Sequence, residues 1–158
     1  MNPLQADPLT DVVEVGDVVC VVTSHLRVES CVHELVHGWL EGALPDWRPV
    51  IRQHAELLHP VCRRMIQLSY AWDSSAVSWE NVFIETLVRV LTAWALEGQD
   101  PSALPRRVAA IVREGFHYAV PMAETLCSGK GVQPLTVEWV ERCLRACQEY
   151  SIALGQRQ

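Results

Sequence analysis

The run His33-Glu34-Leu35-Val36-His37 brings together three side chains that could bind a metal ion and carry out hydrolysis. In a helix the two histidines lie one turn apart on the same face, so both imidazoles can bind one ion. Glu34 projects about 100° round from His33, beside that face, where its carboxylate can act on water as a base. This HExxH pattern predicts a zinc site with Glu34 as the general base.

A catalytic zinc site needs a third protein ligand, and two acidic residues on a later segment are the main candidates. Along a helix from Trp79 to Glu97, Glu80 falls in angle among the apolar residues, whereas Glu85 falls on the polar side. A carboxylate on an apolar face is costly unless it is paired or bound to a cation, whereas Glu85 can pair with Arg89 in water. We therefore predict Glu80 as the third ligand and Glu85 as the alternative.

Other interpretations of these residues stay open from the sequence. Ser78 is a possible N-cap, so Glu80 could instead be a helix-start carboxylate favoured by the macrodipole. Glu41 and His59 are further candidates for the third ligand. His117 and Tyr118 could supply a donor that stabilises a transition state, although the pair could equally form a packed helix end.

The order of the predicted elements places the histidine pair on the first helix of a single domain spanning residues 1–158. Residues 12–17 and 18–23 are rich in β-branched residues and predict a short N-terminal hairpin within 1–25. The remainder, 26–158, has helical periodicity. We predict helices over 26–42, over 49–72 with a break at Pro60, from Ala76 or Ser78 to Glu97, from Pro101 or Pro105 to about Tyr118, and over 136–154. This order of strands followed by helices predicts an α+β fold that is predominantly helical.

The polarity of the first predicted helix indicates which side meets the core. Val28, Val32, Leu35, Val36 and Trp39 share one side, and Ser30, His33, Glu34, His37 and Glu41 share the other. We therefore predict that the apolar side packs inward and that the histidines lie on a polar stripe.

Composition excludes several partners and indicates a compartment. The net charge is −6 with 20% charged residues, which gives no basic patch for nucleic acid. The sequence has neither the pattern of a signal peptide nor an apolar run of the ~18 residues that a membrane span needs. We therefore expect no membrane partner, a cytoplasmic location, and reduced cysteines at the six positions.

The two motifs together resemble those of the gluzincin zinc metallopeptidases. His33-Glu34-Leu35-Val36-His37 is followed on a later predicted helix by Trp79-Glu80-Asn81-Val82-Phe83, and neprilysin-like members carry an E-N-x-x-D pattern there. The family's aspartate would fall at Ile84 and is missing. The short chain resembles the minimal, single-domain members. This resemblance implies a zincin-like fold, Zn²⁺, a polypeptide substrate, and an edge strand at 18–22 that pairs with the substrate.

The leading hypothesis is therefore zinc-dependent hydrolysis of peptide bonds, with His33, His37 and Glu80 as ligands. A second hypothesis is a latent or non-catalytic zinc-binding domain of the same fold that binds a partner. A third is a helical interaction protein in which the HExxH pattern is a coincidence. Oligomeric state, substrate and cleavage preference do not follow from these residues.

Overall fold

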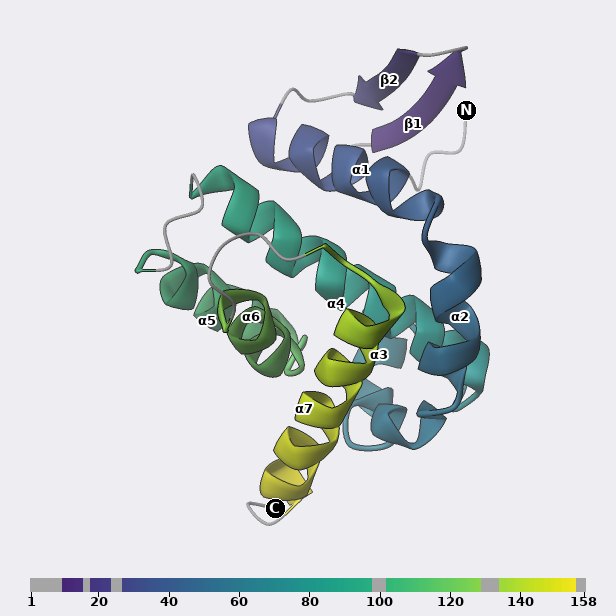
Figure 1. The fold of residues 1–158 in the computed structure, drawn as a ribbon, viewed down its shortest axis with the longest axis vertical. Helices are drawn as coiled ribbons and strands as arrows, with labels where there is room; N and C mark the ends of the chain where they lie inside the picture. Colours follow the sequence, from purple (N-terminus) through teal and green to yellow (C-terminus); the bar gives the residue numbers. More distant parts are fainter. Residues whose placement is uncertain (1–9, 16–17, 24–26, 98–101, 129–133, 156–158) are drawn as a thin grey trace.

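The computed structural model describes residues 10–15, 18–23, 27–97, 102–128 and 134–155, with side chains placed between residues 27 and 153 of these ranges. Two strands, seven α-helices and one 3-10 helix follow one another along the described chain (Figure 1). They are β1 (Thr10–Val15), β2 (Val18–Thr23), α1 (Val28–Glu41), α2 (Leu44–Arg52), η1 (Ala55–Leu58), α3 (Cys62–Gln67), α4 (Ala76–Leu96), α5 (Leu104–Glu114), α6 (Ala119–Cys127) and α7 (Val137–Gly155).

Helix α4 is the element on which the others pack. It contacts α1, α2, η1, α5 and α6. It begins at Ser75, whose side-chain oxygen accepts a hydrogen bond from the backbone N–H of Ser78 at 3.2 Å and so satisfies a donor of the first turn. Its buried side chains, such as Trp79, Leu87, Val88 and Thr92, point in directions that together cover most of the helix circumference. A helix that is apolar on nearly all sides is expected to be central.

Helices α1 and α2 approach α4 at different points along its length, because the chain bends between them. Leu40 at the end of α1 and Trp47 and Ile51 on α2 are buried in the core. Pro45 lies in the first turn of α2, where its missing N–H leaves no hydrogen bond unmade. Helix α2 packs against both α4 and α7.

A glycine turn ends α5 earlier than the sequence indicates. We predicted one helix from Pro101 or Pro105 to about Tyr118, but α5 ends at Glu114 and α6 begins at Ala119, with Pro121 inside α6. Gly115 has φ 121°, a conformation that side chains rarely adopt, and a Cβ there would lie 2.7 Å from the Arg64 Cγ. This turn places Glu114 and Phe116 on the side of the molecule where α4 and α5 meet.

The predicted α+β, zincin-like class is wrong, because helices and their connecting turns build the entire core of the described residues. The core is one cluster of side chains from α1 to α7 and the turns between them. The hairpin pairs β1 with β2 from Thr10↔Thr23 to Val15↔Val18 and lies against α1 (Figure 1). Two strands are too few to form a layer of their own. The described part of the chain also has six α-helices after α1, not about four.

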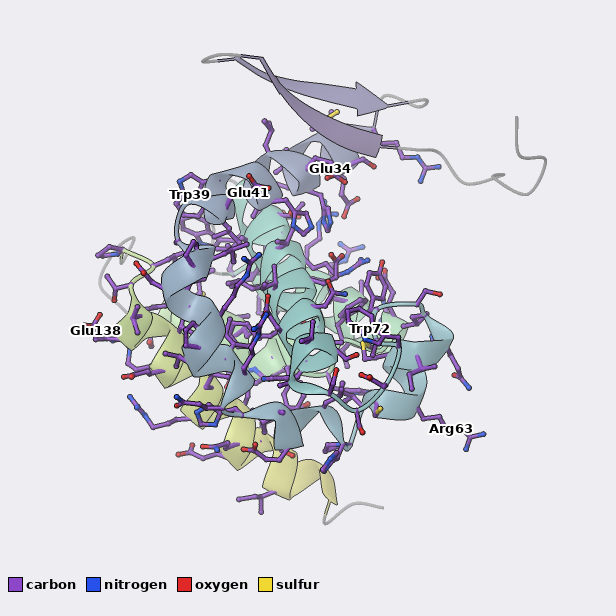
Figure 2. The ribbon with its side chains drawn as sticks, turned by 90° about the vertical axis from the view of Figure 1, so that its right-hand side faces the viewer. Glu34, Trp39, Glu41, Arg63, Trp72 and Glu138 are labelled. Atoms are coloured by element: carbon purple, nitrogen blue, oxygen red, sulfur yellow. The ribbon has the colours of Figure 1, made fainter. Side chains whose placement is uncertain are left out.

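Helix α1 faces the core with a different side from the one predicted. Val28, Leu35 and Trp39 are 69%, 46% and 66% exposed, and Trp39 lies at the outer surface in Figure 2. The side toward α4 instead carries His33 and His37 and ends on buried Leu40. The apolar stripe therefore did not identify the inward face, because an acidic residue on α4 offers the histidines a polar partner there.

Candidate metal centre

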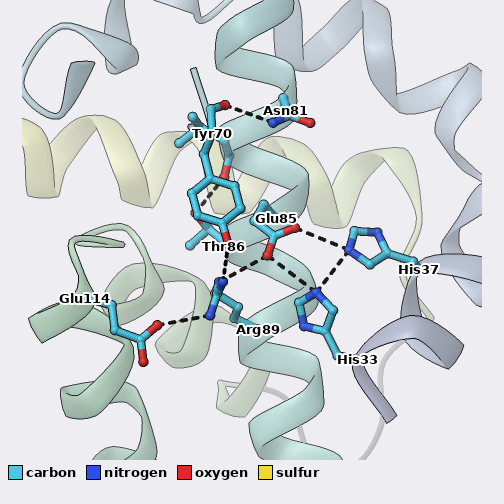
Figure 3. A network of polar contacts seen from close by, with 9 residues as sticks. His33, His37, Tyr70, Asn81, Glu85, Thr86, Arg89 and Glu114 are labelled. Carbon is cyan, nitrogen blue, oxygen red and sulfur yellow. Dashed lines mark hydrogen bonds and ion pairs between the residues drawn. The ribbon is translucent and has the colours of Figure 1, made fainter. Parts of the chain in front are cut away.

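Helices α1 and α4 bring three potential metal ligands together (Figure 3). The His33 Nε2 lies 3.4 Å from one carboxylate oxygen of Glu85, Oε1, and the His37 Nε2 lies 3.3 Å from the other, Oε2. The two Nε2 atoms are 3.2 Å apart. Among the histidine, cysteine and acidic side chains of the described residues, His33, His37 and Glu85 form a group that could hold a metal ion.

The distances within this group suit a single tetrahedral ion. Ligand atoms that lie 2.0–2.1 Å from zinc in a tetrahedron are about 3.3 Å from one another. The separation of 3.2 Å between the two Nε2 atoms matches that edge length, and each Nε2 lies a similar distance, 3.4 or 3.3 Å, from a different oxygen of Glu85. One ligand atom from each residue lies within 4.8 Å of the others, so the three residues could hold one metal ion.

The protonation states of the group also suit a metal ion. Burial lowers the pKa of His33, although the Glu85 carboxylate opposes this effect. Burial alone would raise the pKa of Glu85, but a hydrogen bond from His37 and the charges of His33 and Arg89 outweigh it, so the net pKa is lowered. A neutral imidazole and an ionised carboxylate are the forms that bind metal.

Glu80, which we predicted as the third ligand, lies elsewhere. Its carboxylate pairs with the Arg48 Nε at 3.0 Å and the Arg52 Nε at 2.5 Å, both on α2. The premise that a carboxylate on the apolar side of this helix needs a cation was sound, since Glu80 is only 7% exposed. The cation is a pair of arginines, and the carboxylate that meets the imidazoles belongs to Glu85.

Glu34 borders a cavity next to the histidines. The cavity has a volume of about 490 Å³, lies between α1, α4 and α5, and is lined by His33 and Glu34 at one end. Arg89, Arg107 and Glu114 also line it. Glu34 is half-buried on α1, where Figure 2 labels it. The candidate base and one candidate ligand therefore share an opening large enough for part of a peptide.

The structure does not bring His117 or Tyr118 to this cavity. Tyr118 is 1% exposed, its hydroxyl donates to the Leu57 carbonyl at 2.6 Å, and its ring meets Trp79 edge to face. Burial raises its pKa to about 12. His117 lies in the turn between α5 and α6, and neither residue lines the cavity. Tyr118 is a core residue, which is the alternative that the sequence left open.

A second set of residues surrounds Glu85, and sequence reasoning missed it. The Arg89 Nε lies 3.2 Å from Glu85 Oε1, and the guanidinium also contacts Glu114 and the Tyr70 hydroxyl (Figure 3). The available signal was the spacing of Glu85 and Arg89, which we interpreted as a solvated pair. In the E-N-x-x-D pattern the aspartate follows the glutamate by four residues. With Glu85 as the ligand, that position is occupied by Arg89.

Comparisons with known proteins identify no relative of this chain. No family model, curated protein or solved structure matches the chain. Among the described residues, no helix combines the length and apolar character that crossing a membrane requires. The function must therefore be argued from the geometry of the site.

Proposed function

We propose that this protein is a zinc-dependent peptidase in which His33, His37 and Glu85 hold the ion and Glu34 is the general base. The observation that carries the proposal is the approach of both imidazoles to the Glu85 carboxylate, at 3.4 and 3.3 Å, with the two Nε2 atoms 3.2 Å apart. Two histidines and one glutamate are a ligand set of catalytic zinc sites, whereas structural zinc sites use four protein ligands. The fourth position of the tetrahedron would then be open to the reactants.

The residues around the ion divide the chemistry among them. Bound zinc would supply positive charge that polarises a peptide carbonyl. Glu34 accepts a proton from the attacking water at a carboxylate oxygen and later donates it to the nitrogen of the leaving amine. The cavity beside His33 and Glu34 holds the polypeptide next to these groups. Its walls exclude part of the solvent, which strengthens the electrostatic interactions between them.

A second candidate function is a zinc-binding domain that recognises a partner without cleaving it. The specific observation in its favour is the exposure of Val28, Leu35 and Trp39 on one side of the helix that carries the histidines. An exposed apolar stripe is a feature of interaction surfaces. In this case the metal would stabilise the packing of α1 against α4.

The test combines metal analysis with an activity assay. The purified chain is expected to retain about one zinc per molecule and to cleave an unfolded protein substrate, and a chelator should abolish the cleavage. Glu34→Gln should keep zinc and lose cleavage by about 100- to 10,000-fold, the range typical of a general base. The matched control is Glu41→Gln, an exposed glutamate on the same helix, which should cleave normally.

The outcomes separate the two candidates. Full activity of Glu34→Gln would refute the assigned base. A zinc-loaded wild-type chain that cleaves no peptide bond in a diverse peptide library would support the partner-binding function instead. A chain that binds no zinc would contradict both.

A further inference from the structure

Arg89 is the most restrained side chain around the candidate metal centre. Its Nη1 donates to Glu114 Oε2 at 3.0 Å, and its Nη2 donates to the Tyr70 hydroxyl at 2.6 Å. The guanidinium also lies over two rings, 4.3 Å from the centroid of Phe116 and 5.3 Å from that of Tyr70. Hydrogen bonds at both ends and aromatic rings beside its plane fix the orientation of the guanidinium.

The fixed guanidinium makes the two oxygens of Glu85 different. Oε1 lies 3.2 Å from the Arg89 Nε and 3.4 Å from the His33 Nε2, whereas Oε2 faces the His37 Nε2 at 3.3 Å and has no arginine beside it among these contacts. The Arg89 Nε makes no hydrogen bond with other described residues, so the approach to Oε1 is an ion pair rather than an aligned hydrogen bond. Both partners are largely buried, with side-chain exposures of 22% and 12%, so solvent screens this pair only in part.

We propose that Arg89 is a positioning residue, which holds one oxygen of Glu85 and leaves the other for the metal ion. A carboxylate held in this way binds an ion through one oxygen only. Binding through both oxygens would occupy a further coordination position, and that position is the one that hydrolysis needs. The inference rests on the metal site of the proposed function but does not require peptide cleavage.

Three separate segments maintain Arg89 in place. Tyr70 follows α3, Glu114 is the last residue of α5, and Phe116 follows the glycine turn. The orientation of Glu85 therefore depends on the packing of α3 and α5 against α4, and not on α4 alone. Partners in the second shell of a metal site commonly affect metal affinity by about 10–100-fold.

The experiment measures the zinc dissociation constant of each variant by competition with a coloured chelator. Arg89→Met should raise the constant by about 10–100-fold. Arg89→Lys should also raise it, because an ammonium group keeps the charge but cannot contact Glu85, Glu114 and Tyr70 from one planar group. The control is Arg107→Met: Arg107 lines the same cavity but pairs with Glu97 and Glu29, so the constant should not change.

Cobalt substitution gives a readout that a loss of general packing would not produce. The wild-type chain loaded with Co²⁺ should show the intense visible absorption of a four-coordinate ion. In Arg89→Met the carboxylate can turn and bind through both oxygens, so the coordination number should rise and the absorption should weaken. An unchanged spectrum together with an unchanged zinc constant would overturn the proposal.

Two milder variants keep the test decisive if Arg89→Met does not fold. Tyr70→Phe and Glu114→Gln each remove one hydrogen-bond or ion-pair partner of Arg89 and leave the metal ligands intact. Both should weaken zinc binding, and normal binding in both would refute the role of Arg89. A wild-type chain that binds no zinc would instead show that the metal site, and with it the proposed function, is wrong.

Discussion

Exchanging the two carboxylates of α4 for carboxamides should separate metal binding from stability. Glu85→Gln and Glu80→Gln are matched changes, because both residues lie on one helix and both side chains are largely buried, at 12% and 10% exposed. We expect Glu85→Gln to lose metal affinity and Glu80→Gln to lose stability. Each variant serves as the control for the other.

The magnitudes follow from the contacts. Residues that contact a metal ligand, but not the metal, already affect metal affinity by up to about 100-fold. Loss of a direct ligand at Glu85 should therefore weaken zinc binding by at least ~100-fold, or about 2.7 kcal/mol. For Glu80, breaking a fully buried ion pair costs about 3–5 kcal/mol, and an exposed pair is worth about 0–1 kcal/mol. Since the side chains of Arg48 and Arg52 are 48% and 45% exposed, we expect about 2 kcal/mol for Glu80→Gln.

The assays are a zinc competition titration and thermal unfolding in the presence of a chelator. For a chain of this length, about 2 kcal/mol corresponds to a fall in Tm of roughly 4–8 °C. The chelator is needed because bound metal stabilises the folded state and would confuse the two effects. If Glu80→Gln lost zinc and Glu85→Gln retained it, the assignment of the third ligand would be refuted. If Glu80→Gln kept the wild-type Tm, the arginine pair would contribute nothing to the packing of α2 on α4.

Two further predictions concern the core and the exposed side of α1. Burial raises the pKa of the Cys143 thiol to about 12 from 9.0. Below pH 9 the buried thiol should therefore not reduce the free energy of unfolding. From pH 9 toward pH 12 that free energy should fall by about 1 kcal/mol per pH unit, because the unfolded chain releases a proton that the folded chain retains. Urea unfolding under reducing conditions at pH 8 and pH 10.5 measures this fall, and Cys143→Ala should reduce it; equal stability at both pH values would contradict the burial of the thiol. Trp39→Ala should change the free energy of unfolding by less than about 0.5 kcal/mol, whereas Trp47→Ala, at a 2% exposed position, should cost about 3–5 kcal/mol. Similar losses in the two tryptophan variants would show that the outer side of α1 is packed after all.

Three of the helices were predictable from the sequence because their signals are local. The apolar run located α4, which spans Ala76–Leu96 against a predicted start at Ala76 or Ser78 and end at Glu97, and its N-cap is Ser75 rather than Ser78. The last helix spans Val137–Gly155 against a predicted 136–154. The helix with the two histidines lies within its predicted range as well. Local periodicity and caps determine such elements without knowledge of their neighbours.

The fold class was not predictable in the same way, because it depends on how far strands associate. The β-branched residues predicted strands over 12–17 and 18–23, and the described strands are Thr10–Val15 and Val18–Thr23. Whether such strands form a layer of the core depends on further strands and on side chains that pack across them. The hairpin here contacts α1, and the helices bury one another without it.

The choice between Glu80 and Glu85 shows why helical angle alone did not identify the third ligand. Five residues separate them, so they project about 140° apart and cannot face the same neighbouring helix. The division of α4 into a core side and a solvent side assumed that only one of these directions is covered. In the structure α2 covers the direction of Glu80 and α1 covers that of Glu85, so both carboxylates are buried and each needs a cation. Arginines occur on α2 and histidines on α1. The residue types on the covering helices therefore decide which carboxylate meets a metal ion, and only the packing of the helices reveals which helix covers which carboxylate.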